Sequence, residues 1–241
     1  MNLKGLSNEE RRKITKSFPV LISGYANSGK STAVEFLPDE EKARTIIFLA
    51  EGKQLPEDEE SAYRTIYRLK AEDDTTKKDF ANVKYKTIEE FLPIMKKAIA
   101  HAEVDRIILD SFTAYVDALE RTYVKLHNGF QIWTTYSQHL YDLFSMMKEE
   151  TYTHGCFFYC LGHYVPVKDK KDKDGEMFTK VAGSKHYRMV ESNFNTVVTL
   201  EDFHFTADNT NQFDSTRIKR SLNPYESKLN SLAELEEALS K

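Results

Sequence analysis

Cysteines and long apolar runs are both scarce in this sequence, and each shortage excludes a class of protein. There are two cysteines in 241 residues, so a scaffold held together by several disulfides is excluded. No apolar run approaches the ~20 residues that cross a bilayer, and the polar residues 1–18 lack the apolar core of a signal peptide. We therefore expect a soluble, cytoplasmic protein that has no membrane partner.

An excess of one charge is also missing. The chain carries 34 Lys and Arg against 38 Asp and Glu, a formal net charge of -4. A strongly basic chain would indicate nucleic-acid binding; this balance neither indicates nor excludes it, because a basic patch can lie on an acidic protein. Cys156 and Cys160 lie in one apolar run without metal-ligand spacing, so we expect two buried thiols on one face of a strand.

Segments that read as buried strands alternate with segments of helical spacing. This alternation predicts an α/β fold in which a mostly parallel central sheet carries helices on both faces. With 40% hydrophobic residues, the chain can bury one sizeable core. The expected strands are 18–23, 45–50, 82–86, 106–110, 156–161, 196–200, 203–206 and 216–220, and the expected helices are 30–37, 87–101, 116–126, 131–150 and 231–241, with helix and loop over 51–78 and a short helix within 181–190.

The clearest motif is a phosphate-binding loop that fits the pattern G-x-x-x-x-G-K-[ST], with an apolar strand before it and a helical segment after it. Backbone N–H groups of such a loop turn toward phosphate oxygens, and the following helix presents its positive end there. Lys30 is expected to reach the β- and γ-phosphates, and Ser31 to place its hydroxyl on Mg²⁺. The residues predicted to bind ATP and Mg²⁺ are Gly24, Tyr25, Ala26, Asn27, Ser28, Gly29, Lys30, Ser31 and Thr32.

Asp110 ends the apolar segment that begins at Arg106. We expect this strand to lie beside the strand of the phosphate loop, where its terminal carboxylate supports the magnesium ion. The alternative is that Asp110 caps a helix or occupies a turn. Ser111 follows directly and could cap the next segment.

Two further polar residues follow apolar strands. Glu51 comes after residues 45–50, and His163 comes after residues 156–161. Because the carboxyl ends of parallel strands meet at one edge, beside the ligand crevice, Glu51 could activate the water that attacks the γ-phosphate. His163 could hydrogen-bond the γ-phosphate and report its loss to a following loop. A plain strand-end glutamate and a satisfied loop histidine are the alternatives.

Together these segments resemble the RecA-like ATPase core. Residues 48–56 resemble the segment in which RecA-type recombinases carry a catalytic glutamate, and Leu109-Asp110-Ser111 resembles their Walker B strand. The segments Gln131-Ile132-Trp133 and Gly162-His163, with 181–185 and 194–198, resemble those of a phage subgroup of RecA-like single-strand annealing ATPases. Two departures stand out: RecA itself has a glutamine where this chain has His163, and residues 168–176 are charged where the family's nucleic-acid loops are glycine-rich.

The resemblance covers roughly residues 18–221. It implies a RecA-like ATPase core there, with residues 1–17 as an N-terminal arm and residues 222–241 as a C-terminal tail and helix. It also implies a homo-oligomeric ring or filament, in which a neighbouring subunit inserts a basic side chain at the γ-phosphate. Lys219 or Arg220 is the candidate for that side chain, and an exposed basic strand face is the alternative.

A lysine cluster follows the strand that precedes His163. Its members are Lys168, Lys170, Lys171 and Lys173, which alternate with aspartates. In the RecA architecture a loop at this place touches single-stranded DNA, so these lysines could contact phosphates. Tyr164 and Phe178 flank the loop and could stack on bases. A solvated hairpin tip is the alternative.

Three functions are open on this sequence. The first is an ATP- and Mg²⁺-dependent RecA-like ATPase of phage DNA recombination that acts on single-stranded DNA in the cytoplasm of a bacterial host. Its catalytic residues would be Lys30, Glu51, Asp110 and His163. The second is a nucleotide or small-molecule kinase on the same core, although no arginine-rich lid segment is found. The third is a nucleotide-gated assembly module with little turnover.

Overall fold

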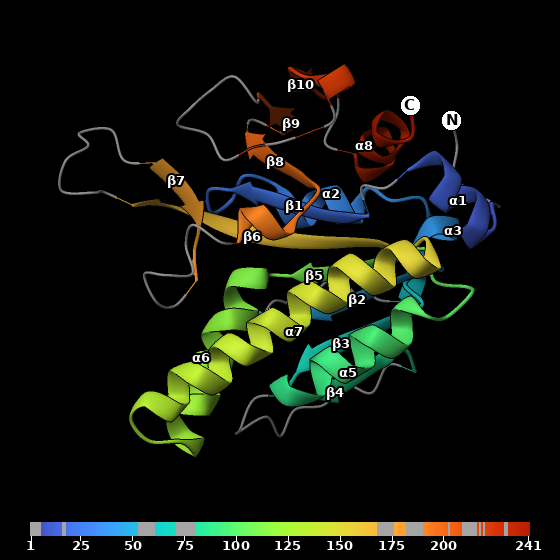
Figure 1. Ribbon diagram of the computed structural model, residues 1–241. Helices are drawn as coiled ribbons and strands as arrows, with labels where there is room; N and C mark the ends of the chain where they lie inside the picture. The colour runs from blue at the N-terminus through green and yellow to red at the C-terminus, as the bar shows by residue number, and fades with distance from the viewer. Residues whose placement is uncertain are drawn as a thin grey trace.

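A computed structural model shows one large, mostly parallel sheet enclosed by helices (Figure 1). The structure describes residues 6–15, 18–52, 61–70, 81–167, 176–181, 190–201, 203–208, 216, 218, 220–228 and 231–241. The strand order is β10-β9-β8-β1-β6-β5-β2-β3-β4, and β7 pairs with β6 outside this row. In this row, each pair of adjacent strands from β8 to β4 is parallel. The pairs β8–β9, β9–β10 and β6–β7 are antiparallel.

The strands have the following bounds. They are β1 (Pro19–Gly24), β2 (Thr45–Leu49), β3 (Thr65–Leu69), β4 (Val83–Lys86), β5 (Arg106–Asp110), β6 (Phe157–Val167), β7 (Glu176–Thr179), β8 (Thr196–Glu201), β9 (His204–Ala207) and β10 (Tyr225–Glu226).

Helices cover both faces of the sheet, which explains why its central strands are almost continuously apolar. In β1, Leu21 packs into the cluster on one face, while Val20 and Ile22 pack into the cluster on the other. The predicted α/β class, with a mostly parallel central sheet that carries helices on both faces, is confirmed by this arrangement. One face carries α5 (Ile88–Ile99), α6 (Phe112–Leu126) and α7 (Phe130–His154), and the other carries α2 (Lys30–Glu35) and α8 (Leu232–Leu239) (Figure 1).

Both ends of the described chain are docked on this core. In α8, Leu232, Leu235 and Leu239 are fully buried against the sheet. Two short helices, α1 (Asn8–Ile14) and α3 (Asp39–Lys42), lie near the same end of the molecule as α8 (Figure 1). Among the described residues, no helix combines the length and the apolar character needed to cross a membrane.

The predicted buried thiols are confirmed. Cys156 and Cys160 are free and fully buried in the cluster that packs against α7. Desolvation raises the pKa of both thiols above the ordinary value. These cysteines therefore act as small core residues.

The strand order corrects one prediction about the site. β5 does not lie beside β1, because β6 lies between them and pairs with both. The segment 157–161 of β6 is buried throughout, so it occupies the centre of the sheet. Asp110 is consequently level with Leu161 of β6, which separates it from the loop strand.

Two segments differ from their predicted secondary structure. Residues 51–78 contain β3, which sequence analysis missed because Ile66 alone in that strand is buried and the strand lacks a clear alternation. Residues 216–220 are not a strand in their described part, since Arg220 begins a 3-10 helix, η3 (Arg220–Leu222). The Thr216 hydroxyl is used locally, accepting a hydrogen bond of 3.1 Å from the backbone N–H of Asp208.

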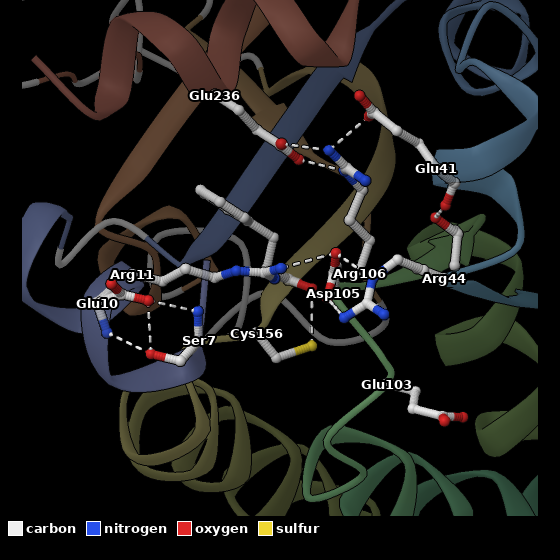
Figure 2. A network of polar contacts seen from close by, with 12 residues as sticks. Ser7, Glu10, Arg11, Glu41, Arg44, Glu103, Asp105, Arg106, Cys156 and Glu236 are labelled. Atoms are coloured by element: carbon white, nitrogen blue, oxygen red, sulfur yellow. Dashed lines mark hydrogen bonds and ion pairs between the residues drawn. The ribbon is translucent and has the colours of Figure 1, made fainter. Parts of the chain in front are cut away.

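A buried ion-pair network joins the start of β5 to the surrounding helices (Figure 2). The Arg106 guanidinium donates two hydrogen bonds of 2.5 Å to the Glu236 carboxylate of α8 and lies 2.7 Å from Glu41 of α3. The Tyr159 hydroxyl donates to the same Glu236 at 2.9 Å. A buried charge costs several kcal/mol unless it is paired, so Glu236 is needed to keep Arg106 in this position.

Asp105, next to Arg106, makes a second set of ion pairs (Figure 2). It accepts two hydrogen bonds of 2.7 Å from Arg44 and lies 2.7 Å from Arg11 of α1. Burial raises the pKa of Asp105, but the bonds from Arg44 and Arg11 outweigh burial and hold that pKa below its ordinary value. Asp105, directly before β5, and Arg106, its first residue, thus attach α1, α3 and α8 to the sheet.

Replacing Glu236 should destabilise the protein strongly. In Glu236→Ala the Arg106 charge keeps Glu41 but loses its bidentate partner inside the core, and we expect a loss of about 3 kcal/mol in the free energy of unfolding. Denaturant unfolding measures this loss. The matched control is Glu237→Ala, which removes an exposed neighbour on the same helix and should change stability little. Equal stabilities of the two variants would contradict the structural role of the network.

The Asp105 pairs should also make stability depend on pH. A carboxylate with a lowered native pKa stabilises the fold above its unfolded pKa of about 3.9, and that stabilisation is lost as pH falls through the native pKa. We therefore expect the stability difference between wild type and Asp105→Asn to be constant above about pH 5 and to shrink toward pH 3. Denaturant unfolding across this pH range tests it, and a difference that grows on acidification would contradict the assignment.

Candidate active site

The loop between β1 and α2 has the backbone shape that phosphate binding requires. Asn27 and Gly29 have positive φ angles of 64° and 91°, a conformation that turns successive N–H groups toward one centre. A Cβ atom at Gly24 would lie 2.7 Å from both the carbonyl oxygen of Leu200 and the Ser28 hydroxyl. Only glycine therefore fits where β8 approaches the loop.

The side chain of Lys30 lies inside the curve of this loop. Its Nζ donates hydrogen bonds to the carbonyl oxygens of Gly24 (3.1 Å) and Tyr25 (2.7 Å) and to the Ser28 hydroxyl (3.3 Å). Lys30 is 6% exposed, so the ammonium group is already held where phosphates are expected. A phosphate would replace these neutral acceptors with charged ones, so that direct charge attraction adds to the hydrogen bonds of the ammonium group.

Ser31 and Asp110 meet at the predicted magnesium position. The Ser31 hydroxyl, in the first turn of α2, donates a 2.8 Å hydrogen bond to Asp110 Oδ2 at the end of β5. Asp110 is buried. Hydroxyl and carboxylate oxygens are the ligand type that Mg²⁺ prefers, so this pair fits the predicted ion.

Glu51 and His163 also lie together. The His163 Nε2 atom is 3.2 Å from Glu51 Oε1, and the Ser111 hydroxyl donates to the same oxygen at 2.6 Å. Both side chains are partly exposed, His163 at 27% and Glu51 at 20%, so they remain accessible to water and ligand. A carboxylate next to an imidazole on an accessible edge has the geometry of a general base with a neighbouring hydrogen-bonding partner.

The sheet explains why these residues meet. Glu51 follows β2, Asp110 ends β5, His163 lies in β6 and Gly24 ends β1, and these four strands are consecutive neighbours. In the parallel register, Gly24 lies opposite His163, and Asp110 lies opposite Leu161. The predicted residues therefore share one edge of the sheet.

Sequence analysis placed His163 after its strand, whereas it lies within β6. β6 continues to Val167 and forms an antiparallel hairpin with β7. Gly162 reads as a strand end in sequence but serves a close approach, because a Cβ atom there would lie 2.6 Å from Thr179 Cγ2 of β7. The backbone N–H of Lys180, just after β7, donates to the carbonyl oxygen of His163 at 2.9 Å.

Two supporting residues at this edge were missed as site residues. Ser111 was considered only as a helix cap, and Thr113 was not considered at all. The Thr113 hydroxyl accepts a 2.9 Å hydrogen bond from the backbone N–H of His163. Both belong to the start of α6, whose N-terminal position directly after Asp110 is the one signal that could have pointed to them.

The predicted nucleic-acid and subunit contacts lie largely outside the described residues. Lys168, Lys170, Lys171, Lys173 and Lys219 are all in this group, and so is the side chain of Phe178. Of Arg220, only the backbone is described. The prediction that Tyr164 stacks on bases is wrong, because its side chain is buried and its hydroxyl lies 2.9 Å from the Thr199 hydroxyl.

No protein family and no curated protein matches the sequence. Among solved structures, a KaiC-like protein from the hyperthermophilic archaeon Pyrococcus horikoshii OT3 is similar at 14% identity and a TM-score of 0.42, over 78% of this chain and 72% of that one. The RadB recombinase is similar at 13% identity and a TM-score of 0.46, over 77% of this chain and 75% of that one. The fold assignment rests on the strand order and the loop geometry of this chain.

Lys30→Ala should weaken the binding of magnesium–ATP by at least about tenfold, because it removes the charged donor from the loop. Titration calorimetry with a non-hydrolysable ATP analogue measures the affinity. Lys96→Ala, which removes an exposed lysine of α5, is the matched control and should bind normally. Unchanged affinity in Lys30→Ala would contradict the placement of phosphates in this loop.

Proposed function

We propose that this protein is a RecA-like ATPase that hydrolyses ATP with magnesium and couples hydrolysis to single-stranded DNA. The observation that carries the proposal is the position of Glu51 beside Ser111 and His163, on the same sheet edge as Lys30, Ser31 and Asp110. A phosphate-binding loop by itself indicates that a nucleotide is bound, and not that it is hydrolysed. A carboxylate and an imidazole aligned with it add the means to activate water.

Each side chain has a distinct part in the proposed reaction. Lys30 binds the β- and γ-phosphates, while Ser31 and Asp110 are the residues that would hold Mg²⁺. Magnesium supplies neutralisation of the charge that develops on the phosphate oxygens. Glu51 orients the attacking water and accepts its proton, and His163 hydrogen-bonds the γ-phosphate. Because the proposed base, Glu51, is a residue of this chain at the same sheet edge as Lys30, the proposed acceptor of the phosphate is water and the reaction is a hydrolysis.

The β6–β7 hairpin supports a route from hydrolysis to DNA. His163 lies in β6, and its carbonyl oxygen is bonded to Lys180 after β7. The segment 168–175, with its four lysines, connects the two strands of this hairpin. A change of hydrogen bonding at His163 on loss of the γ-phosphate would therefore act on the strand that leads into the lysine segment.

Association into a homo-oligomer, of the ring or filament type, is part of the proposal. The RecA-like resemblance supports it, and Lys219 or Arg220 would then reach the nucleotide of a neighbouring subunit. The proposed setting is phage recombination in a bacterial cytoplasm, which rests on the same resemblance.

Glu51→Gln should lower the rate of ATP hydrolysis by roughly 10²–10⁴-fold, since it keeps the shape of the side chain but removes the base. Phosphate release under saturating magnesium–ATP measures this rate. Glu89→Gln, an exposed glutamate of α5, is the matched control. Full activity of Glu51→Gln would contradict the assignment of the base, and transfer of phosphate to a nucleoside would favour a kinase.

DNA coupling is tested by hydrolysis and binding with single-stranded DNA across a salt series. Replacing the four lysines of residues 168–173 by glutamine should make the plot of log affinity against log salt shallower by up to about 3, at 0.7 per phosphate for single strands. The control replaces four exposed lysines elsewhere, Lys84, Lys96, Lys97 and Lys125. Hydrolysis and binding that ignore DNA at low salt would contradict this part of the proposal.

A further inference from the structure

The carboxylate of Glu51 is held by a hydroxyl from a neighbouring strand end. The Ser111 Oγ lies 2.6 Å from Glu51 Oε1, closer than the 3.2 Å of His163 Nε2 to the same oxygen. Ser111 is 1% exposed, so bulk water competes little for this contact. The shorter and more buried of these two contacts to Glu51 is therefore the one from Ser111.

The same hydroxyl is the N-cap of α6. Its oxygen accepts a 3.1 Å hydrogen bond from the backbone N–H of Ala114. A hydroxyl has one proton to donate, and because the Ala114 N–H is itself a donor, it uses an oxygen lone pair and leaves that proton for Glu51. The start of α6 thus fixes the direction in which Ser111 donates.

We infer that Ser111 is a positioning residue, which aims the Glu51 carboxylate at the attacking water through a hydroxyl oriented by the α6 N-terminus. The inference deepens the proposed function and rests on Glu51 being the base. Ser111 also follows Asp110 directly, so two adjacent residues supply the carboxylate on the magnesium side and the donor that orients the base. The same hydroxyl therefore both caps α6 and orients Glu51.

The proposed role of Ser111 differs from that of a plain helix cap in its effect on the ionisation of Glu51. A hydrogen bond to a carboxylate stabilises the charged form and lowers its pKa. Removing the Ser111 hydroxyl should therefore move the acid limb of the kcat–pH profile upward, by about one pH unit, and lower kcat by roughly ten- to a hundredfold. The KM for ATP should stay nearly constant, because the side-chain hydrogen bonds of Ser111 go to Glu51 and Ala114 and not to Lys30 or the phosphate loop.

The test compares three substitutions in the full-length protein. Ser111→Gly removes the hydroxyl but keeps a good N-cap residue, since glycine costs only a few tenths of a kcal/mol there, so this variant should fold. Ser111→Thr keeps a hydroxyl and should recover most of kcat and the normal acid limb. Ser231→Ala removes the N-cap serine of α8, which accepts from the Glu234 N–H at 3.4 Å, and should lower stability without moving the pH profile.

A double-substitution cycle completes the test. If Ser111 acts through Glu51, adding Ser111→Gly to Glu51→Gln should produce almost no further loss of kcat. A folded Ser111→Gly variant with the wild-type kcat and acid limb would overturn the inference while leaving Glu51 as the base. Wild-type activity in Glu51→Gln itself would instead overturn the proposed function, so the two failures are distinguishable.

Discussion

The parallel register of β1, β6, β5 and β2 is the constraint on which the rest of the site depends. Because these four strands run side by side in one direction, the residues at their carboxyl ends converge from positions far apart in the chain. Ser31 reaches Asp110, and Glu51 reaches both Ser111 and His163, only in this register. If one of these strands slipped by one residue, each of its side chains would turn to the opposite face of the sheet.

β5 connects the buried ion-pair network, where the strand begins, to the candidate site, where it ends. Its first residue, Arg106, and the preceding Asp105 hold α1, α3 and α8 through buried ion pairs (Figure 2), and its last residue is Asp110. The buried pairs are costly to form and more costly to break, so they specify one position of the strand. That position in turn sets Asp110 against Ser31. The stability network and the site therefore share a five-residue strand.

The fold class and the strand-end residues were predictable because they depend on local patterns. Lys30 is fixed by the loop motif, and Asp110 by the apolar strand that it ends. The contact of Ser111 with Glu51 was not predictable, since it requires β2 and β5 to be neighbours and a cap to donate in a particular direction. The prediction that β5 lies beside β1 was wrong for a related reason: apolar strands of similar composition do not reveal which of them lies at the centre of the sheet. The pair of Arg106 with Glu236 joins residues from opposite parts of the chain and leaves no local signal.

A crystal structure with magnesium and a non-hydrolysable ATP analogue tests the central claim most directly. The account predicts that Lys30 Nζ leaves the carbonyl oxygens of Gly24 and Tyr25 for phosphate oxygens, and that Ser31 turns from Asp110 to the metal. It also predicts one water between Glu51 and the γ-phosphate, with the Ser111 contact retained. An analogue bound away from this loop, or a Glu51 carboxylate too far from the γ-phosphate for a single water, would contradict the claim that this sheet edge is a hydrolytic site.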